Sequence, residues 1–141
     1  MIGLEQARAI VAGALAGART ESLKPLAVIV LDAGGHPVAF EREDGASLFR
    51  FDIARAKATG ALGMGQDTRV LAKAAAERPG FFNSVSVAVG GQIALSPGGV
   101  LVRDEAGAII GAVGISGDTG DADEACALAG IAAAGLKGGS L

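Results

Sequence analysis

The stretch from Gly107 to Gly135, GAIIGAVGISGDTGDADEACALAGIAAAG, determines how this chain folds. Its first part, from Ala108 to Ile115, is a short apolar run with a turn signal on each side. Such a run predicts a buried β-strand. Gly111 and Gly114 lie inside the run, and glycine within a strand often marks a close approach of another backbone or a ligand. This strand should therefore lie at the centre of the fold.

The residues after this strand predict a loop and then a helix. Ser116 to Asp121 is rich in glycine and polar residues and ends the apolar run. Asp121, Asp123 and Glu124 would lie in the first helical turn, where carboxylates suit the positive end of the helix dipole. Gly135 is placed to end the helix in the left-handed conformation. We expect this strand, loop and helix to form one wall of any site.

The composition is that of a single domain over residues 1–141. Half of the 141 residues are hydrophobic but only 4% are aromatic, so alanine, valine, isoleucine and leucine must build the core. This length suits one domain with a substantial core. The 23 glycines indicate tight turns and close packing rather than disorder, because the apolar content is high.

Charge, cysteine content and hydropathy exclude several classes of protein. The net charge of −3 comes with no basic stripe and no aromatic series, so nucleic acid is not an expected partner. Cys126 is the only cysteine, which excludes an internal disulfide and a cysteine zinc cluster. No apolar run is long enough to span a bilayer, and Glu5 and Arg8 in an amphipathic N-terminal pattern are not typical of a signal peptide. We expect a soluble, cytoplasmic protein with no membrane partner.

Periodicity predicts the remaining elements. Helical spacing indicates helices at 3–21, 51–64 and 68–77, and apolar or alternating runs indicate strands at 26–31, 37–43 and 100–103. The segment from Phe81 to Leu95 is mixed, since Val85, Val87 and Val89 alternate like a strand before two glycines interrupt them. Counted as a strand, it gives the order α-β-β-α-α-β-β-β-α. Because hairpins dominate, this order predicts an α+β domain with about five antiparallel strands flanked by helices.

The last predicted helix is apolar nearly all round. One face can pack on the sheet, and in a domain this small the other needs a partner subunit or another helix. We therefore expect a homo-oligomer, at least a dimer. The apolar residues of this helix are Ala125, Leu128, Ala129, Ile131, Ala132 and Ala133.

Five segments together resemble a known family. They are LDAGGHPVAFEREDGA at 31–46, AKAT at 56–59, PGGV at 97–100, IGAVGISG at 110–117 and DE at 123–124. In this order, over nearly the whole chain, they are similar to the GlcG/HbpS family of haem-binding-protein-like domains, which also occurs at the C-terminus of some corrinoid adenosyltransferases. The resemblance implies a five-stranded antiparallel sheet flanked by helices, assembly into dimers or larger even oligomers, and haem as a candidate cofactor.

His36 is the only histidine and the first candidate for chemistry. Its imidazole can ligate haem iron or another metal, or act as an acid or base near pH 7. The alternative is a turn residue that hydrogen-bonds its own hairpin. A site with several histidines is excluded, and one histidine with carboxylates would be a weak zinc site.

Lys57 is the second candidate. On the sequence alone a lysine beside an apolar stripe is most simply a surface residue. The match of Ala56-Lys57-Ala58-Thr59 to the family makes Lys57, rather than Arg55, the candidate to bind an anionic group of a ligand.

The loop before the last helix supplies further candidates. It is not a phosphate-binding P-loop, because the Gly-Lys-Ser/Thr ending is missing. We expect it mainly to cap its own helix through Asp118, Thr119 or Asp121. Ser116, Gly117 and Thr119 are nevertheless candidate ligand-binding residues, through hydroxyl or backbone donors. A Ser-His-Asp hydrolase is not expected, since there is no nucleophile elbow.

Two kinds of function remain open, together with an accessory or assembly protein that has no ligand. The first is a protein that binds haem or another small anionic molecule at a subunit edge. The second is an enzyme of small organic acid catabolism that uses acid–base chemistry, with His36, Lys57 or Asp123 as catalytic candidates. If the first and last major strands are neighbours, the Gly34–His36 turn, Lys57 and the loop from Ser116 to Thr119 would form one site.

Overall fold

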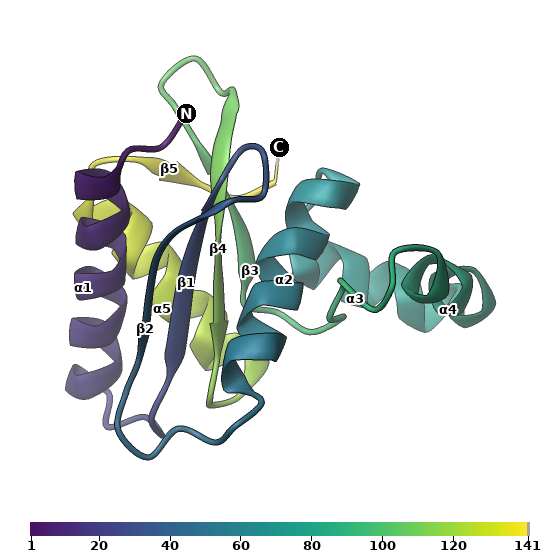
Figure 1. The fold of residues 1–141 in the computed structure, drawn as a ribbon, viewed down its shortest axis with the longest axis horizontal. Coiled ribbons are helices and arrows are strands. Elements are labelled where there is room, and N and C mark those ends of the chain that lie inside the picture. The colour runs from purple at the N-terminus through teal and green to yellow at the C-terminus, as the bar shows by residue number, and fades with distance from the viewer. Residues whose placement is uncertain (141) are drawn as a thin grey trace.

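The computed structural model describes residues 1–140, which form a five-stranded antiparallel sheet with helices on both faces (Figure 1). The elements are α1 (Leu4–Thr20), β1 (Ala27–Asp32), β2 (Pro37–Arg42), α2 (Arg50–Met64), α3 (Thr68–Glu77), α4 (Pro79–Ala88), β3 (Gly99–Arg103), β4 (Ile109–Ser116), α5 (Gly120–Ala133) and β5 (Lys137–Gly138). The strand order is β2-β1-β4-β3-β5. The predicted α+β class and five-stranded antiparallel sheet are confirmed.

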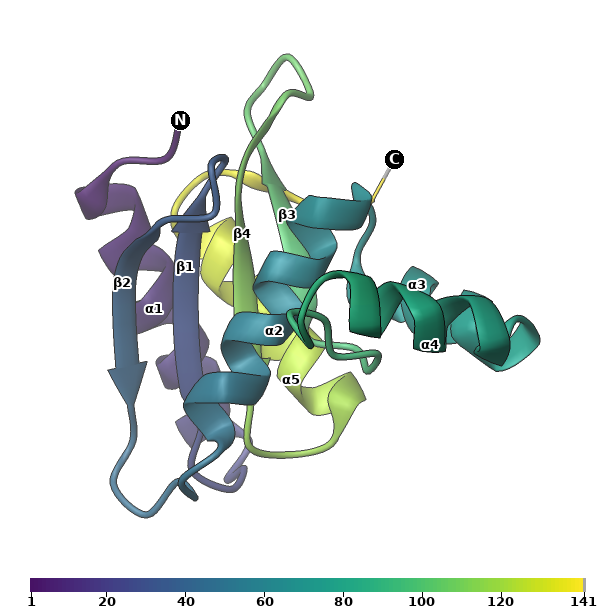
Figure 2. The same ribbon diagram turned by 45° about the vertical axis from the view of Figure 1, so that its right-hand side comes forward.

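Helices α1 and α5 cover one face of the sheet and α2 covers the other, while α3 and α4 extend away from it (Figure 2). In β1, Val28 and Val30 pack toward α1 and α5, and Ala27, Ile29 and Leu31 pack toward α2. Successive side chains of a strand point to opposite faces. A strand that is covered on both faces has no solvent side, so β1 and β4 read as continuous apolar runs.

Strand β4 and helix α2 approach each other closely at Gly114. A Cβ atom built at this position would overlap the carbonyl oxygen of Ala54 and lie 3.0 Å from the Cβ atom of Ala58. The backbone of α2 cannot be displaced without opening the core on this face of the sheet. The close approach predicted for the glycines of this strand is therefore an approach of helix α2 to β4.

Gly114→Val is expected to lower the free energy of unfolding by about 1–3 kcal/mol or more, because overpacking there meets backbone rather than a movable side chain. Gly80→Val is the matched control, since a Cβ atom at Gly80 meets nothing within 4 Å. Chemical denaturation of both variants measures the difference. Equal stability of the two variants would contradict the close packing.

The segment from Phe81 to Ala88 belongs to a helix, α4, rather than to a strand. Pro79 occupies the start of this helix, where its missing N–H is not needed. Val85 and Val89 are four residues apart, a spacing that fits a helix as well as the period of a strand. In a strand, Val87 would share one face with Val85 and Val89, but it is 83% exposed. In a helix, Val85 and Val89 share one side without Val87. The fifth strand is β5, which pairs with β3 near the C-terminus.

Helix α5 is covered on two sides within the chain. It packs on the sheet, and a Cβ atom at Gly130 would overlap the carbonyl oxygen of Ile10, which shows how closely α1 crosses it. Cys126 is buried in this core, as a small hydrophobe would be. Helix α1 thus covers one side of α5, whereas Leu128, at 41%, and four of its alanines stay exposed: Ala125, Ala129, Ala132 and Ala133. Within residues 1–140 no helix is long and apolar enough to span a membrane.

Candidate functional site

The turn from Asp32 to His36 connects β1 and β2 at one end of the sheet. The Asp32 carboxylate accepts hydrogen bonds from the backbone N–H groups of Gly34 and His36, at 2.9 and 3.0 Å. The same oxygen lies 3.1 Å from the His36 Nδ1 atom. The bond from the His36 backbone N–H is the main cause of a lowered pKa for Asp32, so this carboxylate is ionised at neutral pH.

This contact determines which nitrogen of His36 is available. A carboxylate can only accept, so Nδ1 carries the hydrogen, and in the neutral imidazole Nε2 then keeps its lone pair. The side chain is 78% exposed, and no residue of the described chain hydrogen-bonds Nε2. Carboxylates hold metal-ligating histidines in this way. His36 therefore bonds its own hairpin and at the same time presents a free ligand atom.

A buried ion pair lies at the opposite end of the sheet. Lys57 from α2 is 3% exposed and Asp123 from α5 is 1% exposed, with 3.2 Å between Nζ and Oδ2. The Lys57 ammonium also donates to the carbonyl oxygen of Ile115 at 2.9 Å, and Asp123 accepts the N–H of Asp118 at 3.0 Å. The pair thus connects α2, β4 and α5. The surface position that the sequence alone favours for Lys57 is wrong.

Burial dominates the electrostatics of this pair. Removal from water raises the pKa of Asp123 and lowers the pKa of Lys57, and in each case it outweighs the attraction between the two charges. The nearby charge of Arg50 lowers the pKa of Lys57 further. Both groups are bound to each other and shielded from solvent, a geometry that favours a structural role.

The loop after β4 is engaged within the chain. A Cβ atom at Gly117 would overlap the carbonyl oxygen of Pro25, so this glycine lets the loop pack against the start of β1. The hydroxyl of Thr119 accepts the N–H of Ala122 at 3.2 Å and caps α5, which confirms the expected capping role. Binding of a ligand by this loop stays a prediction.

Arg50 is a member of this cluster that sequence reasoning missed. Its Nη1 atom donates to the hydroxyl of Ser116 at 3.0 Å, and its Nε atom donates to the hydroxyl of Ser47 at 3.1 Å. Ser116 is itself buried. Arg50 and Ser116 are 66 residues apart, and no spacing or motif in the sequence connects them.

The register of the sheet separates the two groups of candidate residues. Strands β1 and β4 are neighbours, as expected, but they are antiparallel. Ser116 therefore pairs with Ala27 at the start of β1, whereas His36 follows its end. The length of β1 is about 16 Å at the usual rise per residue. The single site predicted from the Gly34–His36 turn, Lys57 and the loop from Ser116 to Thr119 is therefore divided between the two ends of the sheet.

The sheet order and its covering helices define a single-domain α+β fold. The family described as "Haem degrading protein HbpS-like" matches residues 2–132. The chain belongs to this HbpS-like family, as its sequence motifs predict. A search of curated proteins found no match.

Three solved structures are similar over nearly the whole chain. Protein ORFY of Klebsiella pneumoniae is 28% identical with a TM-score of 0.85, over 95% of this chain and 90% of that one. A double mutant of HbpS from Streptomyces reticuli is 30% identical with a TM-score of 0.79, over 93% and 85%. The PduOC protein, crystallised as a haem complex, is 24% identical with a TM-score of 0.87, over 96% of both chains. The last of these supports the fold alone.

Proposed function

We propose that this protein binds haem and that His36 is an axial ligand of the iron. The observation that carries the proposal is the exposed imidazole whose Nδ1 atom is held by the Asp32 carboxylate. This contact fixes the ring and leaves Nε2 as the ligand atom. The residues present thus fit the group at one axial position. When bound, haem would supply iron for redox or ligand-binding chemistry, and the turn would orient the imidazole toward it.

The comparisons support haem as the ligand. The family is described by haem degradation, and the structurally similar PduOC protein was crystallised with haem. The Lys57 ammonium is paired inside the chain at the other end of the sheet, so the proposal does not assign it to a propionate. It rests on the turn at His36.

The surroundings of His36 favour a site that is completed by a second subunit. The best-formed cavities of residues 1–140 are lined by other residues, so none of them encloses the His36 turn. At the other end of the sheet, next to Arg50, Leu48 is 80% exposed and Phe49 is 66% exposed, an apolar surface that supports self-association but lies away from the His36 turn. We propose a homo-oligomer, at least a dimer, that binds haem at a subunit edge.

Titration of hemin into the purified protein tests the proposal. A Soret band characteristic of histidine ligation is expected to saturate at a fixed ratio of hemin to protein. Light scattering at micromolar protein concentration should give at least twice the mass of one chain. A monomer that gains no Soret band at stoichiometric hemin would overturn both parts of the proposal.

The geometry gives less support to acid–base catalysis of organic acids. Such a site would need its candidates together, but His36 lies at one end of β1 and the buried pair of Lys57 and Asp123 lies at the other. Neither member of the pair is open to a substrate. Haem binding therefore remains the function that the geometry supports best.

A further inference from the structure

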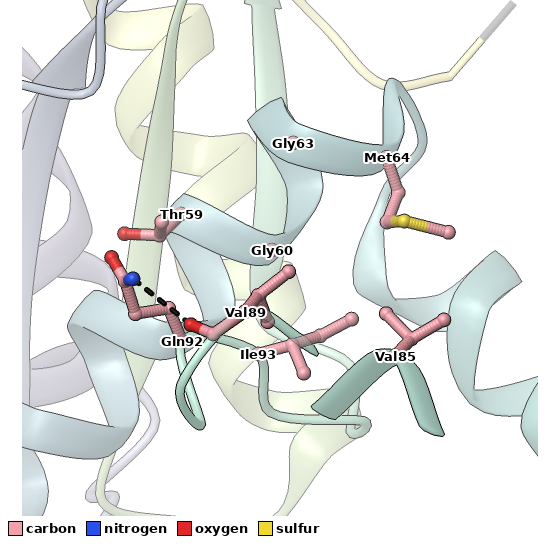
Figure 3. Close-up of a pocket in the computed structure, with 8 residues that line it drawn as sticks. All are labelled: Thr59, Gly60, Gly63, Met64, Val85, Val89, Gln92 and Ile93. Atoms are coloured by element: carbon pink, nitrogen blue, oxygen red, sulfur yellow. Dashed lines mark hydrogen bonds between the residues drawn. The ribbon is translucent and has the colours of Figure 1, made fainter. Parts of the chain in front are cut away.

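A cavity of about 230 Å³ lies between α2 and the end of α4, far along the chain from the His36 turn (Figure 3). Figure 3 shows Met64, Val85, Val89 and Ile93 around it, with Thr59 and Gln92 together at one edge. Two glycines of α2 complete the lining, Gly60 and Gly63. None of these residues belongs to the buried ion pair or to the turn that carries His36.

The lining determines the chemical class of ligand. It contains no charged side chain, so a charged ligand would lose its hydration without a counterion. The Gln92 amide donates to the Val89 carbonyl at 2.9 Å, which leaves its Oε1 atom to accept a hydrogen bond. Neither this atom nor the Thr59 hydroxyl has a side-chain partner among residues 1–140. The cavity therefore combines apolar walls with two polar atoms at one edge.

The volume limits the size of the ligand. A dry apolar cavity of about 150 Å³ is large enough for benzene. The cavity here is about one and a half times that size and is open to solvent on the side of its exposed residues Gly63, Met64, Val89 and Gln92. It has room for one ring with a short substituent and does not enclose a tetrapyrrole. We propose that it binds a small, uncharged, single-ring molecule whose hydroxyl group bonds Gln92 or Thr59.

Gly63 keeps the cavity open. A Cβ atom at this position meets no atom within 4 Å, so this exposed glycine leaves open space at the mouth of the cavity. Glycine inside a helix costs about 1 kcal/mol relative to alanine, and nothing packs closely enough against Gly63 to require it. A larger side chain at this position has room to cover the mouth of the cavity without displacing any neighbour.

The ligand would also connect two parts of the molecule. Thr59 and Met64 lie on α2, which packs on the sheet, whereas Val85 and Val89 belong to α4 and its end. Helix α4 packs chiefly against α3 and hardly touches the sheet. A molecule in the cavity would contact both α2 and α4 and should therefore slow the local opening of α4.

The test uses p-cresol as the probe, with benzoate as a charged ligand of similar size. Saturable NMR shifts of amides in α2 and α4 are expected with p-cresol and not with benzoate. Hydrogen exchange in α4 should slow in the presence of p-cresol. Benzoate binding as tightly as p-cresol, or shifts spread over the whole surface, would overturn the proposal.

Two variants fill the cavity from opposite sides. Gly63→Leu and Val89→Phe are each expected to weaken p-cresol binding about tenfold or more. Val89 is partly exposed, so its variant should fold even if Gly63→Leu does not. Gly80→Leu, a matched change outside the cavity, should bind p-cresol as the wild type does. Unchanged binding of p-cresol by both cavity variants would contradict the proposed site.

Hemin titration of Gly63→Leu should match that of the wild type, because the proposed haem site and the cavity are distinct.

Discussion

Lys57→Met is expected to lower the free energy of unfolding by about 3–5 kcal/mol, the usual cost of removing one partner of a buried ion pair. Methionine nearly matches the volume of the lysine stem, so little packing is lost. The cost arises because Asp123, 1% exposed, would lose the ammonium that lies 3.2 Å away and would have to bear an unpaired buried charge or take up a proton. Chemical denaturation, monitored by circular dichroism, measures the change.

A double variant separates the ion pair from simple packing. Lys57→Met with Asp123→Asn leaves no buried charge, and the amide oxygen can still accept the N–H of Asp118. It should be more stable than Lys57→Met alone. Lys73→Met, on the exposed side of α3, is the matched control and should change stability by no more than about 0.5 kcal/mol. A double variant no more stable than the single one would show that packing, not charge, is responsible.

The pH dependence of Lys57→Met gives an independent check. Burial already raises the pKa of Asp123, and loss of the ammonium would raise it further. A group with a raised pKa in the folded state stabilises that state below its unfolded pKa, and the contribution is lost as pH rises through the folded pKa. The difference in the free energy of unfolding between wild type and Lys57→Met should therefore be smallest in acid and grow toward neutral pH.

Most of the fold could be predicted because its signals are local. Apolar periodicity placed α1, α2 and α3, and the glycine and acidic residues around α5 marked both of its ends. Gly135 has φ of 73°, the left-handed conformation expected just after a helix. The segment at α4 was misjudged because Val85 and Val89 satisfy the helical period and the strand period alike. A strand of two residues such as β5 has no periodicity to detect.

The site was less predictable because it depends on contacts between distant residues. Lys57 and Asp123 are 66 residues apart, and only the folded chain reveals that α2 and α5 bring them together. The antiparallel register of β1 and β4 likewise decides that Ser116 and His36 lie at opposite ends. By contrast, the contact of His36 with Asp32 spans four residues within one turn, which is why both interpretations of His36 could be stated from the sequence.

His36→Ala is expected to abolish axial ligation of hemin, which would appear as loss of the histidine-ligated Soret band. No other imidazole can take its place, since the chain has a single histidine. Asp32→Asn keeps the ring but removes the charged acceptor of Nδ1, and loss of such a partner typically weakens metal affinity 10- to 100-fold. The order of affinity should be wild type, then Asp32→Asn, then His36→Ala.

Metal-free protoporphyrin separates ligation from contact with the porphyrin ring. It cannot be ligated, so wild type and His36→Ala should bind it equally, and Glu41→Ala on β2 should bind hemin as the wild type does. Equal hemin affinity of wild type and His36→Ala would remove His36 from the site. If His36→Ala weakened the binding of protoporphyrin and of hemin to the same extent, the substitution would act on the protein surface and not through an iron ligand. Only a loss confined to hemin, graded through Asp32→Asn, fits a histidine held by a carboxylate and bound to iron.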